Sequence, residues 1–181
     1  MRVFFVILIL FGFAFLVSCN KEIKITKIDA VQDSTIYNFI NDMVVSDSST
    51  FRFNILGERV PTKTFNLWDI RINFSKDDTT FIAMQLEKKD TIFLKQEFLK
   101  VKMTVTQRNE IQKHFNPLMK NSDLEYGYCY IYKPVFSADL STCIVTYGFY
   151  CGIKCAEELT TIFKRENGVW KKLKVVAQRF E

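Results

Sequence analysis

The chain has 181 residues, of which 25 are basic and 20 acidic, so its formal net charge at neutral pH is +5. Hydrophobic residues make up 48% of the chain, whereas it has only 6 Gly and 3 Pro. This composition excludes a largely disordered chain, and the mild positive charge does not indicate a nucleic-acid-binding protein. We therefore expect one folded domain with a substantial core and no nucleic-acid partner.

The N-terminus predicts export. Arg2 precedes an uncharged apolar run from Val3 to Val17, which is shorter than the roughly 20 residues that span a bilayer. Leu16-Val17-Ser18-Cys19 then resembles the lipobox of bacterial lipoproteins. The resemblance implies that residues 1–19 hold the signal peptide with its lipobox, and that a diacylglyceryl-modified Cys19 anchors the chain to a membrane. The alternatives are an uncleaved N-terminal anchor and a plain signal peptide with a chance cysteine.

The residues that follow Cys19 bear on location and domain boundaries. Asn20-Lys21 stands where some inner-membrane lipoproteins carry Asp, so the resemblance implies a place in the cell envelope on the outer membrane, either periplasmic or surface-exposed. Alternating Lys and Ile over residues 20–32 predict a tether. Residues 33–181 are expected to form a single domain.

Helices are predicted mainly in the N-terminal half. Asp33 is a candidate N-cap, and apolar residues recur after it at helical spacing. Ser75 and Asp78 resemble a capping box, which predicts a helix over about 76–88; its β-branched residues make a strand the alternative. A short helix is expected over 106–115. The apolar residues after Asp33 are Ile36, Phe39, Ile40, Met43 and Val44.

Strands are predicted by alternation of apolar and polar residues. In the first half of the chain the pattern predicts strands over 51–55, 68–74 and 101–105, with a loop over 57–64. The strands predicted in the second half lie near 127–133, 142–151, 157–165 and 169–179. Asn167-Gly168 joins the last two as a hairpin turn. The expected fold class is α+β, with N-terminal helices packed on a mostly antiparallel sheet that ends in a four-stranded meander.

Four cysteines lie outside the leader, and an even number in an exported chain predicts two disulfides. Cys151 and Cys155 are separated by only three residues, so we expect them to pair. Cys129 with Cys143 then follows by elimination among three possible connectivities. A redox or metal site is the alternative, but the chain has one histidine, His114, to complete a ligand set. No metal or cofactor is expected.

The sequence contains no recognisable catalytic motif. His114 has no nucleophile in a known arrangement, and Gly-x-Ser-x-Gly is absent. Glu157 and Glu158 would point to opposite faces of a strand, which does not suit an acid/base pair. Asp77 and Asp78 fit a helix N-terminus. We therefore expect a noncatalytic protein, with an envelope hydrolase as a remote alternative.

The candidate ligand-binding residues are aromatic. Tyr126, Tyr128, Tyr130 and Tyr132 recur at every second position and predict a tyrosine stripe on one strand face. Trp170 lies in a basic C-terminal strand that suits a sheet edge. We expect Tyr128, Tyr130 and Trp170 to contact a small ligand in a sheet-lined pocket. A half-buried sheet face explains the stripe equally well.

The C-terminal third resembles many small, uncharacterised bacterial lipoproteins. The matching elements are Lys133-Pro134-Val135-Phe136-Ser137, an Asp139 turn, Cys151-Gly152 with Cys155, and Glu166-Asn167-Gly168-Val169-Trp170-Lys171. Ala156 departs from the pattern, because a second Gly commonly follows the later cysteine there. This group carries no assigned activity. The Gly-x-Trp-Lys ending also resembles the last hairpin of NTF2-like (cystatin-like) domains, which implies a ligand cavity.

These observations predict an envelope lipoprotein that binds a small ligand. The alternative is a protein-interaction lipoprotein, either an assembly factor or an immunity-type inhibitor. A deep aromatic pocket would favour the first, and a flat exposed patch would favour the second.

Overall fold

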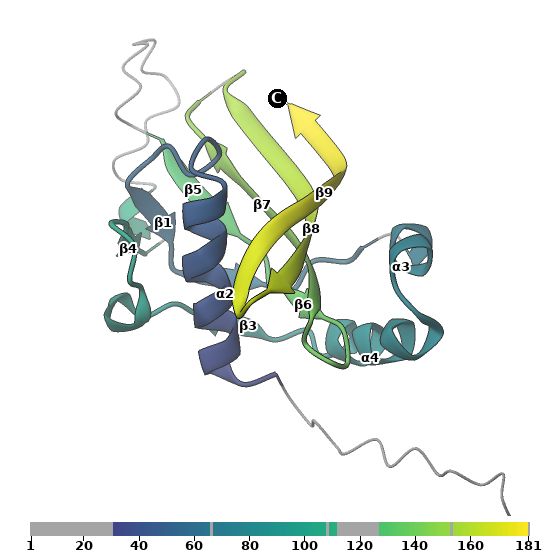
Figure 1. The fold of residues 1–181 in the computed structure, drawn as a ribbon. Helices are drawn as coiled ribbons and strands as arrows, with labels where there is room; N and C mark the ends of the chain where they lie inside the picture. The colour runs from purple at the N-terminus through teal and green to yellow at the C-terminus, as the bar shows by residue number, and fades with distance from the viewer. Residues whose placement is uncertain (1–30, 66, 108, 112–126, 153, 181) are drawn as a thin grey trace, which may run out of the picture. The chain divides into compact units, whose positions relative to one another are not determined.

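The computed structural model describes residues 31–180 except 66, 108, 112–126 and 153, without the side chains of 67–69 (Figure 1). This part of the chain contains helices and a mostly antiparallel sheet, so the α+β prediction is confirmed. The residues from Val31 onward group into one compact unit. Cys19, His114 and Tyr126 lie outside the described residues.

Helix α2 (Asp33–Ser46) is confirmed, and it buries the apolar side predicted from its spacing. The N-cap is Gln32, which makes no side-chain capping bond, so the prediction of Asp33 in that position was wrong by one residue. Asp33 instead lies in the first turn, where the helix dipole favours a carboxylate. Val31 packs against the core, so the predicted tether ends inside the folded unit.

Two further helices pack side by side, and one of them replaces a predicted strand. α3 (Leu67–Asn73) forms where alternation predicted a strand over 68–74. Ile70 is buried but Ile72 is 69% exposed. In a half-buried strand these two side chains would lie on the same face and would both be buried. Ile70 and Phe74 are four residues apart, and on a helix they share a face that packs against Ile82 of α4.

Helix α4 (Lys76–Glu87) begins at the predicted capping box. The Asp78 backbone N–H donates to Ser75 Oγ at 3.1 Å, and Ser75 Oγ donates to the Asp78 carboxylate at 2.7 Å. The helix is thereby confirmed over its strand alternative.

The main sheet contains seven strands among the described residues, in the order β4-β1-β5-β7-β8-β9, with β6 paired to β7. The last four strands of this order form the predicted antiparallel meander. β1 runs parallel to both β4 and β5, which the sequence pattern did not predict. The strand bounds are β1 Ile55–Gly57, β4 Thr104–Thr106, β5 Tyr128–Ile131, β6 Val135–Phe136, β7 Thr142–Tyr150, β8 Ala156–Glu166 and β9 Val169–Phe180.

A separate two-stranded sheet has one of its two strands inside segment 57–64, which was predicted as a loop. β2 (Arg59–Pro61) pairs antiparallel with β3 (Thr91–Phe93). Pro61 ends its strand, a position that tolerates the missing N–H, and its carbonyl accepts from Lys133 N–H at 2.8 Å. A short 3-10 helix, η1 (Gln96–Phe98), follows β3. Phe51 and Phe53 precede β1 and are buried without forming a strand.

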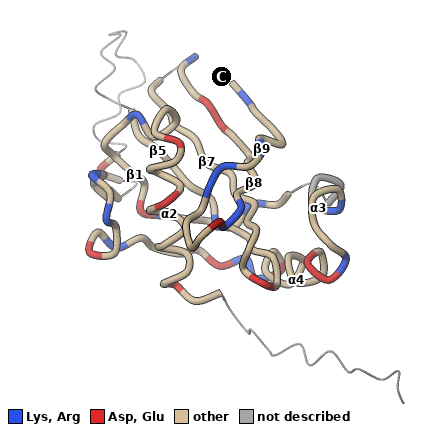
Figure 2. The backbone as a smooth tube through the Cα atoms, viewed as in Figure 1, with Lys and Arg blue, Asp and Glu red and all other residues tan. Residues whose placement is uncertain are grey.

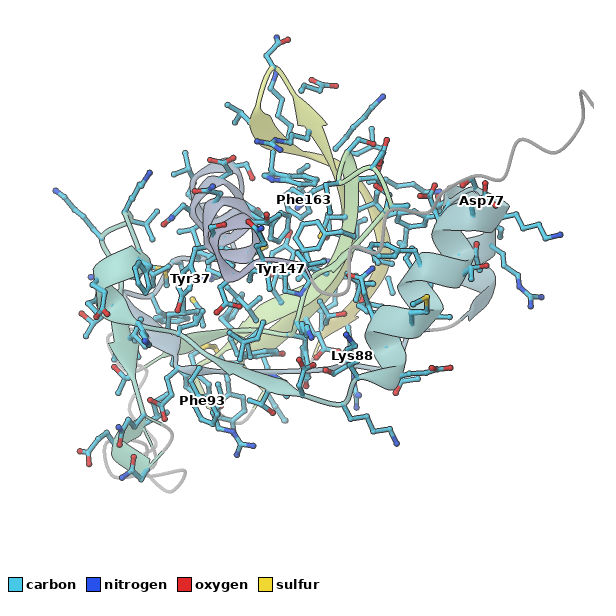
Figure 3. The ribbon with its side chains drawn as sticks, turned by 90° about the horizontal axis from the view of Figure 1, so that it is seen from below. Tyr37, Asp77, Lys88, Phe93, Tyr147 and Phe163 are labelled. Carbon is cyan, nitrogen blue, oxygen red and sulfur yellow. A yellow bond between two sulfur atoms is a disulfide. The ribbon has the colours of Figure 1, made fainter. Side chains whose placement is uncertain are left out.

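Aromatic rings fill the space between α2 and the sheet. The Phe39 ring meets those of Phe136, Phe163 and Trp170 edge-on, with centroids 5.3–5.7 Å apart. Figure 3 shows Tyr147 and Phe163 projecting from the sheet beside α2. A second cluster lies under α3 and α4, where Ile144 of β7 and Ile162 of β8 join Ile70 and Ile82. Because side chains alternate along strands, the two clusters lie on opposite faces of the sheet.

Candidate functional site

Three of the predicted tyrosines lie on one face of the sheet. In β5, Cys129 and Ile131 are buried in the cluster beneath α2. Tyr128 and Tyr130, which alternate with them, are half-buried and therefore point away from α2. Tyr132 continues this row just past the end of the strand.

The tyrosine rings form one continuous surface that includes Tyr150, which the sequence pattern did not indicate. The Tyr130 ring lies 6.4 Å from Tyr128 and 6.0 Å from Tyr132, measured between centroids. Tyr150 of β7 is paired with Tyr128 in register, and its ring is 6.0 Å away. We call Tyr128, Tyr130, Tyr132 and Tyr150 the tyrosine face.

A small pocket opens within the tyrosine face. Its volume is about 80 Å³, well below the roughly 300 Å³ or more of pockets that enclose a small molecule. Side chains from four neighbouring strands, β5, β7, β8 and β9, therefore form a pocket that suits a small chemical group. The lining residues are Tyr130, Tyr150, Ala156, Glu158 and Arg179.

Gly148 sets the spacing of the strands at this pocket. It is paired with both Tyr130 and Glu158. A Cβ at position 148 would lie 2.0 Å from the backbone oxygen of Glu157, closer than any real contact. The close approach of β7 and β8 beside the pocket thus requires glycine.

Glu158 is the only acidic residue among those lining the pocket, and it is already engaged. Its Oε1 forms an ion pair with Lys63 Nζ, and its Oε2 accepts from the Tyr130 hydroxyl at 3.5 Å. Lys63 Nζ also lies 4.8 Å from the centroid of the Tyr132 ring, a cation–π contact. Burial raises the pKa of Tyr130, and the Glu158 charge raises it further. The Tyr130 hydroxyl therefore stays protonated and acts as a donor at neutral pH.

The Cys151–Cys155 disulfide is confirmed, and it closes the hairpin that carries two walls of the pocket. The Cα atoms are 5.2 Å apart, and Cys151 N–H donates to the Cys155 carbonyl at 2.8 Å. Tyr150 precedes this link and Ala156 follows it. The crosslink therefore limits how far these two pocket residues can separate.

The predicted Cys129–Cys143 disulfide was wrong, because both thiols are free and buried. Cys129 of β5 is paired with Phe149, which lies six residues from Cys143 along β7. That separation is about 20 Å, far beyond disulfide reach. Burial raises the pKa of Cys129 to about 11 and raises that of Cys143 well above its ordinary value. Both side chains are unreactive parts of the core.

Trp170 is not part of the tyrosine face, contrary to prediction. It is 2% exposed and packs against Phe39 and Phe136 beneath α2. Its backbone N–H donates to Asp42 Oδ2 at 3.0 Å, which ties β9 to the helix. The proposed ligand set thus loses Trp170 and gains Tyr150, while Tyr128 and Tyr130 remain together.

A buried carboxylate, Asp47, forms a polar cluster that no sequence pattern indicated. Its Oδ2 accepts from the Tyr147 hydroxyl and, at 2.9 Å, from Lys172 Nζ. Ser49 and Thr50 hydroxyls complete its partners. Burial alone raises the pKa of Asp47, but the hydrogen bonds from Lys172, Tyr147 and Ser49 outweigh it and hold the pKa below its ordinary value. This closed network anchors the end of α2 to β7 and β9.

Basic residues gather where β8 turns into β9 (Figure 2). Two of them are paired within the chain: Lys171 with Glu166 at 3.4 Å, and Lys172 with Asp47. β9 is the edge strand predicted for this segment, and its pairing with β8 has two register irregularities. Lysines and bulges of this kind protect an edge strand from adding further strands.

The described residues contain no group of three or more His, Cys, Asp or Glu side chains placed to hold a metal ion. In the same part of the chain, no helix combines the length and the apolar character needed to cross a membrane. Compared with known protein families, curated proteins and solved structures, the chain has no match.

Proposed function

We propose that this chain is a lipid-anchored protein of the cell envelope that binds a partner protein, without catalysis, through its tyrosine face. The lipobox ending at Cys19 supports the anchor and the envelope location. The Cys151–Cys155 disulfide supports export, because disulfides persist in oxidising compartments outside the cytosol.

The observation that carries the proposal is the combination of a broad tyrosine surface with a pocket of about 80 Å³. Tyrosine and arginine are enriched in protein interfaces, where an apolar ring with a polar tip gives contact area at low entropic cost. A pocket this small accepts the end of one side chain. These features favour a protein partner over the enclosed small ligand that was the first expectation.

The carboxylates near the site support a noncatalytic role. Glu158 is bound to Lys63 and Tyr130. Glu157 points to the other face, where it accepts from Gln178 and lies 4.0 Å from Arg52. The two acids therefore do not converge on one space, as an acid/base pair would have to.

The test is to isolate the tagged full chain from chemically crosslinked envelopes of the native host. The double variant Tyr128→Ser/Tyr150→Ser removes two half-buried rings, and Phe93→Ser removes an exposed ring (56%) outside the tyrosine face as a matched control. We expect a specific crosslinked partner with the wild type and with Phe93→Ser, and its loss with the double variant.

Equal partner recovery from the double variant would refute this use of the tyrosine face. If native mass spectrometry found a bound small molecule instead, the small-ligand alternative would replace the proposal. A Cys19→Ser chain that kept the same membrane attachment and the same mass would refute the anchor.

A further inference from the structure

We infer that Lys63 is a positioning residue of the tyrosine face: its side chain holds the rings of Tyr130 and Tyr132 in the orientation that the partner protein meets. This role rests on the proposed function, since it prepares the same surface for the same partner. Three observations support it: the fixed backbone beside Lys63, the contacts of its ammonium group, and the shelter of the ion pair that it forms.

The backbone beside Lys63 is fixed by contacts from other parts of the chain. The Pro61 carbonyl accepts from Lys133 N–H at 2.8 Å, and Lys133 directly follows the tyrosine row. The Thr62 hydroxyl donates to the Asp90 carbonyl, also at 2.8 Å, just before β3. The side chain of Lys63 therefore starts from a defined point beside the tyrosine row.

The ammonium group of Lys63 connects two of the rings. Its Nζ forms an ion pair with Glu158 Oε1 and lies 4.8 Å from the centroid of the Tyr132 ring. The other oxygen of the same carboxylate accepts from the Tyr130 hydroxyl at 3.5 Å. One cation therefore restrains Tyr132 directly and restrains Tyr130 through Glu158.

The Lys63–Glu158 pair is more sheltered from solvent than an ion pair elsewhere on the sheet. Its two side chains are 27% and 23% exposed, whereas those of Lys171 and Glu166, paired at 3.4 Å, are 61% and 49% exposed. Water and salt weaken an exposed pair more than a sheltered one. The Lys63–Glu158 pair is thus better suited to hold neighbouring groups in place, and Lys171 offers a matched control.

Ordered rings favour binding because the free protein has already lost the rotamer freedom that the complex requires. The rings of Tyr130 and Tyr132 lie 6.0 Å apart at an interplanar angle of 89°, so rotation of either one changes the shape of the surface. Burial raises the pKa of both hydroxyls, and the Glu158 charge raises it further. Loss of the Lys63 charge should therefore loosen two protonated, donor-bearing rings and weaken the partner's binding.

The first measurement uses the purified full chain in detergent and needs no partner. Carbon-13 relaxation of labelled tyrosine rings reports their motion. We expect more motion at Tyr130 and Tyr132 in Lys63→Met, which keeps a long side chain without the charge. The buried Tyr147 should not change. Lys63→Arg should restore the wild-type values, since a guanidinium can keep both contacts, and Lys171→Met should equal the wild type.

The second measurement compares recovery of the crosslinked partner from envelopes in a double-mutant cycle. Lys63→Met and Glu158→Gln should each lower recovery about fivefold, because the partner then has to order the rings itself. The chain with both substitutions should be no weaker than the weaker of the two single variants, since both break the same pair. Lys171→Met should stay within twofold of the wild type.

Each contrary result has a definite meaning. Unchanged ring motion in Lys63→Met would overturn the positioning role. Losses of partner that add up in the chain with both substitutions would also overturn it, because Lys63 would then contact the partner directly. If Lys63→Met keeps full recovery while Tyr128→Ser/Tyr150→Ser loses the partner, the proposed function stands and the inference falls. If that tyrosine variant keeps the partner, the proposed function falls, and the inference falls with it.

Discussion

The two faces of the central strands β5 and β7 differ in how completely they are closed. On the face beneath α2, aromatic rings pack edge-on, and a buried carboxylate, Asp47, has four side-chain donors. On the other face, the four tyrosine rings are half-buried around a pocket. The tyrosine face covers only part of that side of the sheet, because Ile144 of β7 is buried there in the cluster under α3 and α4. Along β5, alternate residues serve two purposes, since Cys129 and Ile131 pack in the core while Tyr128 and Tyr130 present a surface.

This comparison predicts that substitutions on the two faces separate stability from binding. Trp170→Ala should lower the free energy of unfolding by about 3–5 kcal/mol, because it empties a packed aromatic site. Tyr128→Ala should cost much less, since Tyr128 is only half-buried. Urea unfolding followed by circular dichroism measures both. If a Trp170→Ala chain kept normal stability but lost its partner, Trp170 would belong to the binding site.

Gly148→Ala tests the close approach of β7 and β8 beside the pocket. The added Cβ would meet the Glu157 backbone oxygen at 2.0 Å, so the strands must separate, at a cost of about 3 kcal/mol. Gly57→Ala is the control, because its Cβ would make ordinary contacts at 3.8 Å. We expect the midpoint of thermal unfolding to fall clearly for Gly148→Ala and far less for Gly57→Ala; equal shifts would contradict the close packing of β7 and β8.

Asp47→Asn tests the closed polar network. Loss of the charge should destabilise the chain by about 2 kcal/mol at neutral pH, because Lys172 loses its charged partner and the amide keeps only one acceptor oxygen for the hydroxyl and ammonium donors around it. Asp77→Asn changes an exposed carboxylate at the start of α4 and should have little effect.

The same variant predicts a pH dependence. The folded-state pKa of Asp47 lies below its ordinary value of 3.8, so its contribution to stability is present above that value. The contribution is lost as the pH falls from 3.8 through the lower folded pKa. The free energy of unfolding of the wild type, measured in urea, should fall as the pH is lowered through this acidic range. In Asp47→Asn this dependence on pH should be smaller. An unchanged slope would show that Asp47 does not contribute.

Opening the disulfide should lower stability about as much as Asp47→Asn does, and it should also act on the tyrosine face. The five-residue loop closed by Cys151 and Cys155 is worth about 2 kcal/mol in the chain-entropy account. Cys151→Ser/Cys155→Ser should therefore fold, with weaker partner binding because the walls at Tyr150 and Ala156 are less restrained. Reduction of the wild type should reproduce this loss and leave the double variant unchanged. Mass spectrometry should find one disulfide in the unreduced chain.

The C-terminal meander could be predicted from sequence because its signals are local. Alternation marks each strand, and Asn167-Gly168 forms the predicted turn, with positive φ at both residues. Over 68–74 the same kind of alternation misled, because residues four apart also share a helix face and tertiary packing chose the helix.

The parts of the site that sequence did not reveal depend on strand register and long-range contacts. Tyr150 joins the tyrosine face only through its pairing with Tyr128, and elimination paired Cys129 with Cys143 without regard to register. Asp47 meets Tyr147 and Lys172 across 100 and 125 residues of chain. No local pattern in the sequence indicates contacts between residues so far apart in the chain.

The most direct test of the central claim is site-specific photo-crosslinking in the native host. A benzophenone amino acid would replace Tyr150 on the tyrosine face or, in a matched chain, the exposed Phe93 of β3. The account predicts one dominant protein adduct from position 150 and none of that mass from position 93. The same adduct from both positions, or an adduct from position 93 alone, would contradict the tyrosine face as the binding surface.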